Sequence, residues 1–239
     1  ADTPPRRAYG TVRVQGDGRL AAAITASLAT AGVAHLDVRA GGVVDDSDVG
    51  AGFLDRDVGR SRACALRDVA RRTHPGIHTG PLRHGRVPDL VLLTDAVVPA
   101  PDVVAPLMAA GAPHLPVRVR EGIGIVGPLV VPGRTSCLRC ADLHRVDLDP
   151  CWPTVAGQLA GRRQQTDLAS AHGTAAIAVG QALRALAPSP QHPPPTWEAT
   201  LELDCYGGTV RRRDWPPHPH CGCGAPARSP RRGPFRQCR

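Results

Sequence analysis

The beginning of the chain carries the pattern that most restricts how this sequence can fold. A short run rich in β-branched residues, 11–14, leads into the glycine turn 16–18, and apolar residues then recur at helical spacing over residues 20–31. After Gly32, a second apolar run at residues 33–38 predicts another strand. Strand, glycine turn, helix and strand in this order form a βαβ unit, whose two strands are parallel. The pattern therefore predicts an α/β fold built on a parallel sheet.

Further along the chain, the pattern changes from parallel to antiparallel pairing. The predicted helices are residues 62–72, 102–110, 154–164 and 168–186. The predicted strands are residues 89–95, the pair 115–120 and 123–131, and the pair 196–204 and 209–214. The first of the two strand pairs is joined by a tight glycine turn and predicts an antiparallel hairpin. The second pair surrounds Gly207-Gly208 in the same way. We expect the parallel sheet to carry an antiparallel hairpin extension.

The composition shifts divide the chain into four parts. Residues 1–10 form a lead-in, and residues 11–187 form the main α/β domain. Residues 188–224 begin with a proline linker and carry the second hairpin and a cysteine knuckle, which we expect to pack on the main domain. Residues 225–239 are rich in Arg and Pro and are expected to be disordered.

Charge and hydropathy exclude several classes of function. All 29 basic residues are Arg, so any mechanism that needs a lysine nucleophile is excluded. No apolar run approaches the ~18–20 residues that cross a bilayer, and the start lacks a signal-peptide stretch, so we expect a cytoplasmic protein without a membrane partner. The net charge of +8 is spread along a chain with only 3% aromatic residues. We therefore do not expect nucleic acid as a partner. A zinc-stabilised, Arg-rich module that binds nucleic acid is kept as an alternative function.

The glycine turn admits two interpretations. Residues 16–21 fit the pattern G-x-G-x-x-A between a strand and a helix, where backbone N–H groups can face a phosphate. Asp17, however, places a carboxylate where an anion would approach, and no acid follows the second strand to hold a ribose. Asp37 is the nearest acid and falls inside that strand. A phosphate-binding turn and a tight turn without a ligand both remain open.

Two close cysteine pairs predict a metal site. Cys137 and Cys140 follow a strand, and Cys221 and Cys223 lie in a knuckle rich in Pro, His and Gly. If the fold brings the pairs together, they form a four-cysteine zinc site that clamps the C-terminal hairpin to the main domain. A free or redox-active thiol pair is the alternative, and His218 or His220 is an alternative ligand. We place Cys64 in the core, interpret Cys151 as an exposed thiol, and expect no second cluster among the histidines.

These features together resemble the ThiF/MoeB/ubiquitin-activating family of ATP-dependent adenylating domains. The resemblance rests on residues 16–32, 47–54, 57–62 and 92–96 and on the two cysteine pairs. A longer block, residues 113–117, 126–145 and 147–153, is similar to the actinobacterial branch. That branch includes ThiF-like partners of azoline-forming cyclodehydratases, which modify ribosomally made peptides. The resemblance implies a Rossmann-like ThiF-type sheet with a four-cysteine zinc knuckle, and a homodimer.

The family's site residues carry over only in part. The glycine turn is matched by Gly16 and Gly18, the phosphate-binding lysine by Arg62, the magnesium-binding aspartate by Asp95, and the zinc ligands by Cys137, Cys140, Cys221 and Cys223. The acids for ribose and metal fall on Ala40 and Gly42, and the arginine that reaches the phosphates falls on Ala51. Because each lost charged donor costs ~3 kcal/mol of transition-state stabilisation, the resemblance implies a degenerate ATP site.

The expected function is a non-catalytic or weakly catalytic partner in peptide or sulfur-carrier modification. Its partners would be a modifying enzyme and that enzyme's peptide or carrier-protein substrate. The alternative is an active adenylyltransferase that binds ATP and magnesium through Arg62, Asp95 and nearby arginines. Cyclodehydratase partners usually carry a leader-binding winged helix ahead of the ThiF part. Residues 1–10 are too few for such a domain, so we expect leader binding only if a segment ahead of Ala1, which is not a Met, supplies it.

Overall fold

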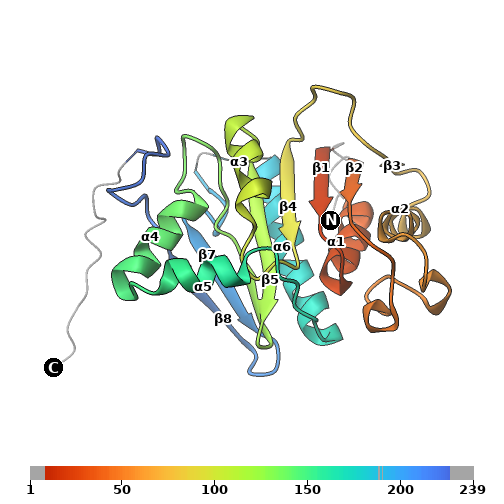
Figure 1. The fold of residues 1–239 in the computed structure, drawn as a ribbon. Helices are drawn as coiled ribbons and strands as arrows, with labels where there is room; N and C mark the ends of the chain where they lie inside the picture. Colours follow the sequence, from red (N-terminus) through yellow and green to blue (C-terminus); the bar gives the residue numbers. More distant parts are fainter. Residues whose placement is uncertain (1–8, 188, 190, 227–239) are drawn as a thin grey trace.

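A mixed sheet of eight strands organises the molecule, for which the computed structural model describes residues 9–187, 189 and 191–226. The strand order is β3-β2-β1-β4-β5-β6-β7-β8 (Figure 1). The parallel half consists of β1 (Tyr9–Gln15), β2 (Val33–Arg39), β3 (His78–Thr79), β4 (Leu90–Thr94) and β5 (His114–Arg120). The antiparallel half adds β6 (Ile123–Val126), β7 (Ala199–Asp204) and β8 (Thr209–Asp214) to β5. The predicted parallel sheet with an antiparallel extension is confirmed.

Helices cover both faces of this sheet. The helices α1 (Arg19–Thr30), α2 (Arg62–Thr73) and α6 (Leu168–Leu186) pack against one face and α3 (Pro101–Ala109) against the other. Alternating side chains of β4 serve the two faces, because Leu90 and Leu92 join the core under α1 and α6 whereas Val91 and Leu93 pack against α3. The helices α4 (Leu138–Leu148) and α5 (Trp152–Leu159) lie beside the antiparallel half (Figure 1).

Several predicted boundaries differ from the structure. The strand predicted to reach residue 131 ends at Val126, because Gly127 turns the backbone with φ +98° and Pro128 has no N–H to donate. The helix predicted over residues 154–164 is α5, which ends at Leu159 because the next residues pair with the loop before α3. Neither α4 nor the two-residue β3 was predicted. Only two residues of α4 are buried, so its sequence shows no long apolar stripe.

The C-terminal part of the chain completes the same sheet. Both strands of the second hairpin lie in the predicted segment 188–224, and β7 pairs with β6 of the main domain. Of the predicted tail 225–239, residues 227–239 lie outside the described residues. Of the predicted lead-in 1–10, residues 1–8 lie outside them. None of the helices in the described part of the chain combines the length and the apolar character needed to cross a bilayer.

Candidate nucleotide cleft, metal centre and arginine-lined cavity

A cavity of about 600 Å³, called the nucleotide cleft below, opens at the edge of the sheet where the parallel strands end. It is lined by the ends of β1, β2 and β4, by the loop before α3 and by residues 161 and 163. This edge is where ligands bind in open α/β sheets. Gly16 and Asp95, two of the predicted site residues, both line the cavity.

Asp95 turns its carboxylate toward the N-terminus of α1. Its Oδ2 accepts hydrogen bonds from the backbone N–H groups of Asp17 at 3.1 Å and Gly18 at 3.2 Å, and from the Thr94 hydroxyl at 2.6 Å. Burial raises the pKa of Asp95, while these hydrogen bonds act against the rise. The N–H groups of the glycine turn, which in a phosphate-binding turn face the ligand, are therefore directed at a carboxylate of the same chain.

The two glycines of the turn make this contact possible. A Cβ atom on Gly16 would lie 1.8 Å from the Thr94 hydroxyl and 2.6 Å from Asp95 Oδ2. A Cβ atom on Gly18 would lie 3.0 Å from Asp95 Oδ1. Close packing of the turn against the end of β4 thus accounts for both glycines without any ligand.

The other acids near the turn are also engaged. The Asp17 carboxylate accepts a hydrogen bond of 2.6 Å from the backbone N–H of Gly41. Asp37 lies inside β2, as predicted, and its buried carboxylate is paired with Arg13 at 2.8 Å and with Arg39 at 3.0 Å. The sequence positions expected to hold a ribose are occupied by residues without a carboxylate, and Asp37 is already neutralised by two arginines.

Arg62 does not line this cavity. Its guanidinium group is buried between η1 (Asp46–Asp48) and α2, where it pairs with Asp48 at 2.7 Å and with Asp45 at 3.0 Å. Arg163 binds the other oxygen of Asp48 at 3.2 Å. Two arginines and two aspartates thus neutralise one another at the side of the cleft.

Arg67 and Arg163 are cations of the cleft that the sequence analysis missed. Both line the cavity, and the Nε of Arg67 is buried without a hydrogen-bond partner in the described part of the chain. Arg163 follows α5 in a segment predicted to be helical, so its position depends on where that helix ends. Arg67 lies on α2 one turn beyond Arg62, and nothing in the sequence distinguishes it from the other arginines of that helix.

The two cysteine pairs converge as predicted. Cys137 caps α4, Cys140 lies in its first turn, and the segment after β8 brings Cys221 and Cys223 to them. The Sγ atoms are 3.6 Å apart for Cys137 and Cys221, 3.6 Å for Cys140 and Cys223, and 3.9 Å for Cys137 and Cys140. Metal–sulfur bonds of about 2.3 Å in a tetrahedron place the sulfur atoms about 3.8 Å apart, so the four thiols fit one tetrahedral metal ion.

The thiols of Cys137 and Cys140 do not have the electrostatic setting of a reactive pair. Burial raises the pKa of Cys140 to about 11 and that of Cys137 further still. At Cys223 burial acts in the same direction, but hydrogen bonds from the backbone N–H of Ala225 and from the neighbouring thiols outweigh it and lower the pKa. A nucleophilic or redox-active cysteine has a lowered pKa, because the thiolate is the reactive form. For Cys137 and Cys140 the raised pKa values argue against a redox pair, and the convergence of four sulfur atoms favours metal binding. The four cysteines need neither His218 nor His220 as a replacement ligand.

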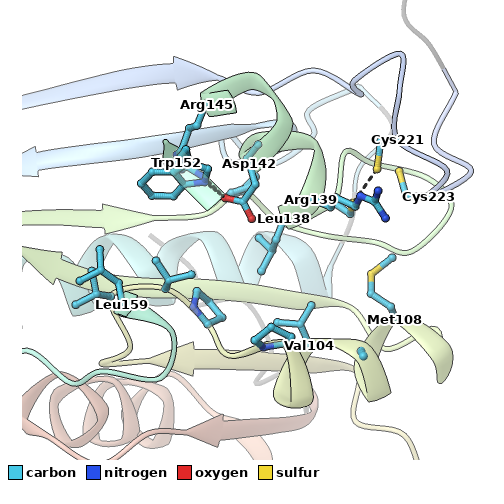
Figure 2. A pocket seen from close by; sticks show the side chains of 18 of the residues that line it. Val104, Met108, Leu138, Arg139, Asp142, Arg145, Trp152, Leu159, Cys221 and Cys223 are labelled. Atoms are coloured by element: carbon cyan, nitrogen blue, oxygen red, sulfur yellow. Dashed lines mark hydrogen bonds and ion pairs between the residues drawn. The ribbon is translucent and has the colours of Figure 1, made fainter. Parts of the chain in front are cut away.

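A second cavity, of about 680 Å³, lies between α3, α4, α5 and the sheet. Figure 2 shows apolar side chains such as Val104, Leu138 and Leu159 facing into it, with Cys221 and Cys223 at one end and Trp152 toward the other. Four arginines line it, at positions 118, 120, 139 and 145, against a single acid, Asp142. The cavity is therefore apolar with an excess of positive charge.

The charges in this cavity are unevenly compensated. Asp142 accepts hydrogen bonds from Arg145 at 2.8 Å and from the Trp152 indole at 3.0 Å (Figure 2). Burial, together with repulsion from neighbouring arginines, lowers the pKa of Arg118 to about 10. No described residue accepts a hydrogen bond from Arg118. An anion bound beside Arg118 would supply the missing partner.

Two further expectations, one about Cys64 and one about the histidines, were wrong. Cys64, expected in the core, is exposed on α2, because the apolar stripe of that helix is formed by its neighbours Ala65, Leu66 and Val69. The histidines do form a second cluster, since His144 of α4 and His218 lie beside Asp147. These residues are far apart in the sequence, and only the return of the chain to α4 brings them together. Cys151 is exposed, as predicted.

The fold is similar to that of several solved structures. E. coli MccB with ATP superposes on this chain with a TM-score of 0.72 at 14% sequence identity, and the match covers 91% of this chain and 67% of MccB. The microcin C7 biosynthetic enzyme MccB in complex with N-formylated MccA superposes with a TM-score of 0.73 at 14% identity, covering 92% of this chain and 69% of the other. PaaA superposes with a TM-score of 0.66 at 13% identity, covering 87% of this chain and 74% of PaaA. No protein-family model and no curated protein matches the sequence. At such low identity the likeness shows the fold alone, and it confirms the ThiF-type Rossmann-like fold.

Proposed function

We propose that this protein is an adenylyltransferase-like member of the ThiF-type fold whose ATP site is degenerate. It acts as a scaffold or substrate-presenting partner in the modification of a peptide, as in azoline formation by cyclodehydratases, or of a sulfur carrier. The similar MccB structures contain ATP and the peptide MccA, which supports a peptide as the partner of this fold. A homodimer remains a prediction from the resemblance alone.

The observation that carries the proposal is the hydrogen bonding of Asp95 to the glycine turn. A nucleotide phosphate placed against the N–H groups of Asp17 and Gly18 would have to displace a buried carboxylate. Arg62, expected to replace the phosphate-binding lysine, is already neutralised by Asp45 and Asp48. Since catalysis of adenylation depends on positive groups aimed at the phosphates, these pairings leave little stabilisation for a leaving pyrophosphate.

The arginine-lined cavity supports the peptide half of the proposal. Its apolar walls fit the side chains of a short peptide segment, and Arg118, from which no described residue accepts a hydrogen bond, offers its guanidinium group to a carboxylate. The loop at residues 97–101 contributes to both cavities, with Pro99 lining each of them. A peptide held in this cavity would therefore lie one loop away from the nucleotide cleft.

The metal in the four-cysteine site is proposed to be zinc, held by Cys137, Cys140, Cys221 and Cys223. Four thiolate ligands are typical of structural zinc and leave no open position for catalysis. Bound there, zinc would supply folding free energy, because it joins α4 to the segment after β8.

An active adenylyltransferase is the second candidate, and one observation favours it. Arg67 lines the nucleotide cleft with a buried Nε that has no partner among the described residues, and Asp95 lies at the position expected for a magnesium ligand. In such an enzyme these two groups would contact phosphate and metal. The first candidate predicts no saturable binding of Mg-ATP tighter than about 100 μM, whereas the second requires it.

The peptide half is tested with two synthetic peptides of leucine and glycine that differ only at the C-terminus. One ends in a free carboxylate and the other in a carboxamide. We expect fluorescence anisotropy to show at least about tenfold tighter binding of the carboxylate, since a charged hydrogen bond contributes ~1.5–3 kcal/mol. Arg118→Met should remove that preference, whereas Arg56→Met, at an exposed site on η2 (Asp55–Asp57), should retain it. Equal binding of both peptides would count against the assigned cavity.

A further inference from the structure

The histidine cluster beside the cysteine site has the composition and the geometry of a second metal centre. Ligand atoms of His144, Asp147 and His218 all lie within 4.8 Å of one another. His144 and Asp147 are three residues apart on α4 and therefore project from the same face of the helix. His218 comes from the segment that also carries Cys221 and Cys223.

The hydrogen bonds of His144 leave one ring nitrogen available to a metal. Its Nε2 lies 3.0 Å from the carbonyl oxygen of Pro216. A carbonyl can only accept, so Nε2 carries the proton and the lone pair is on Nδ1. Metal-ligating histidines typically donate their other N–H to a carbonyl or a carboxylate in this way, which fixes the orientation of the ring.

His218 is held from its other side. The backbone N–H of His220 donates to Nδ1 of His218 at 3.1 Å, so the proton of the neutral ring is on Nε2, which donates to Asp147 Oδ2 at 2.9 Å. The His218 side chain is only 4% exposed, whereas that of Asp147 is 61% exposed. Nε2 thus points from a buried ring toward a carboxylate at the surface. A metal ion can enter there from solvent and take the place of the Nε2 proton, which leaves to water.

We propose that His144, Asp147 and His218 bind a second zinc ion, separate from the four-cysteine site. Two imidazole nitrogens and one carboxylate oxygen form a ligand set that suits zinc. Three protein ligands leave the fourth position to water, which distinguishes this centre from the closed cysteine site. The second ion would fasten α4 to the C-terminal segment a turn beyond the point where the cysteines join them.

The test is a zinc titration of the protein already loaded at its cysteine site, in competition with a chromophoric chelator. Wild type is expected to take up a second equivalent of zinc. Asp147→Asn and His144→Gln should weaken that second equivalent by about tenfold or more and leave the first unchanged. Asp147→Asn retains an oxygen that accepts from His218, so the local fold is preserved. His172→Gln, at an exposed histidine of α6, is the matched control and should bind two equivalents.

Cobalt provides an independent readout of the ligand type. The first equivalent of Co²⁺ should give thiolate charge-transfer absorption, and the second should add d–d absorption without further charge transfer. Uptake of a single equivalent by wild type would overturn the proposal. Persistence of the second equivalent, at unchanged affinity, in both Asp147→Asn and His144→Gln would overturn it as well.

Discussion

Arg62 donates two hydrogen bonds to the same oxygen of Asp48, from Nε at 2.9 Å and from Nη2 at 2.7 Å. The two side chains are 8% and 5% exposed, so the ion pair is buried. The pair joins the start of α2 to η1. In this structure Arg62 is a structural group.

Replacement of Arg62 with Met should therefore lower stability strongly. It leaves the buried Asp48 carboxylate with Arg163 as its one cation among the described residues, and breaking a buried ion pair typically costs ~3–5 kcal/mol. Urea denaturation measures the change in the free energy of unfolding. Adding Asp48→Asn to Arg62→Met should restore part of the loss, because the unpaired charge is then removed. A loss below ~1 kcal/mol in Arg62→Met, no larger than in exposed Arg56→Met, would contradict the structural role.

Asp95 gives a second prediction about the glycine turn. In Asp95→Ala two backbone N–H groups at the start of α1 lose their acceptor, which should cost ~1–3 kcal/mol. Asp95→Asn should cost less, since the amide oxygen still accepts and Asn tolerates the positive φ of 69° at this position. Thermal denaturation of the two variants, beside exposed Asp102→Asn of α3, measures the difference. Equal stability of Asp95→Ala and wild type would show that the carboxylate is not the partner of the turn.

Asp57 predicts how stability depends on pH. Burial alone would raise its pKa, but the N–H of Leu54 and the guanidinium groups of Arg72 and Arg60 outweigh burial, so the pKa lies below 3.8. Because the folded pKa is lower than the unfolded one, this carboxylate stabilises the fold above about pH 4 and loses that effect as the pH falls through the folded pKa.

The measurement is the free energy of unfolding from pH 7 to pH 3 in wild type and in Asp57→Asn. The variant should be less stable at pH 7 and should lose less stability on acidification than wild type. Parallel pH profiles for the two proteins would show that Asp57 does not contribute through its charge.

The cysteine site predicts a linked loss of metal and stability. Cys137→Ser or Cys221→Ser should release about one zinc per chain and lower the melting temperature, because binding free energy at a structural site is folding free energy. Elemental analysis after dialysis measures the zinc. Cys64→Ser, at an exposed cysteine of α2, is the control and should change neither quantity. Unchanged zinc content in both ligand variants would rule out a shared metal.

The local pattern of the sequence was sufficient for the parallel half of the fold. The runs that form β1, α1 and β2 each show the period of their own element, and the glycine turn between them has room for no side chain at Gly16. The spacing of the cysteine pairs likewise predicted their convergence, because each pair occurs on a short loop that can turn toward a common ion.

The parts that were not predicted depend on contacts between distant segments. The helix α4 buries little apolar surface and is held by the chain that returns after β8, so its own sequence carries a weak helical signal. The cluster of His144 and His218 exists only because of that return. The pairing of Arg62 with Asp48, rather than with a ligand, also follows from tertiary structure, since a motif match records only that the positive charge is retained.

The most direct measurement is calorimetric titration of the zinc-loaded protein with Mg-ATP. The titration is repeated at a second temperature, because binding with an enthalpy near zero at the first temperature would give no heat. With Asp95 on the glycine turn and Arg62 neutralised by Asp45 and Asp48, we expect no saturable heat at either temperature. Saturable binding tighter than about 100 μM, equivalent to ~5.5 kcal/mol, would contradict the account and establish a working nucleotide site.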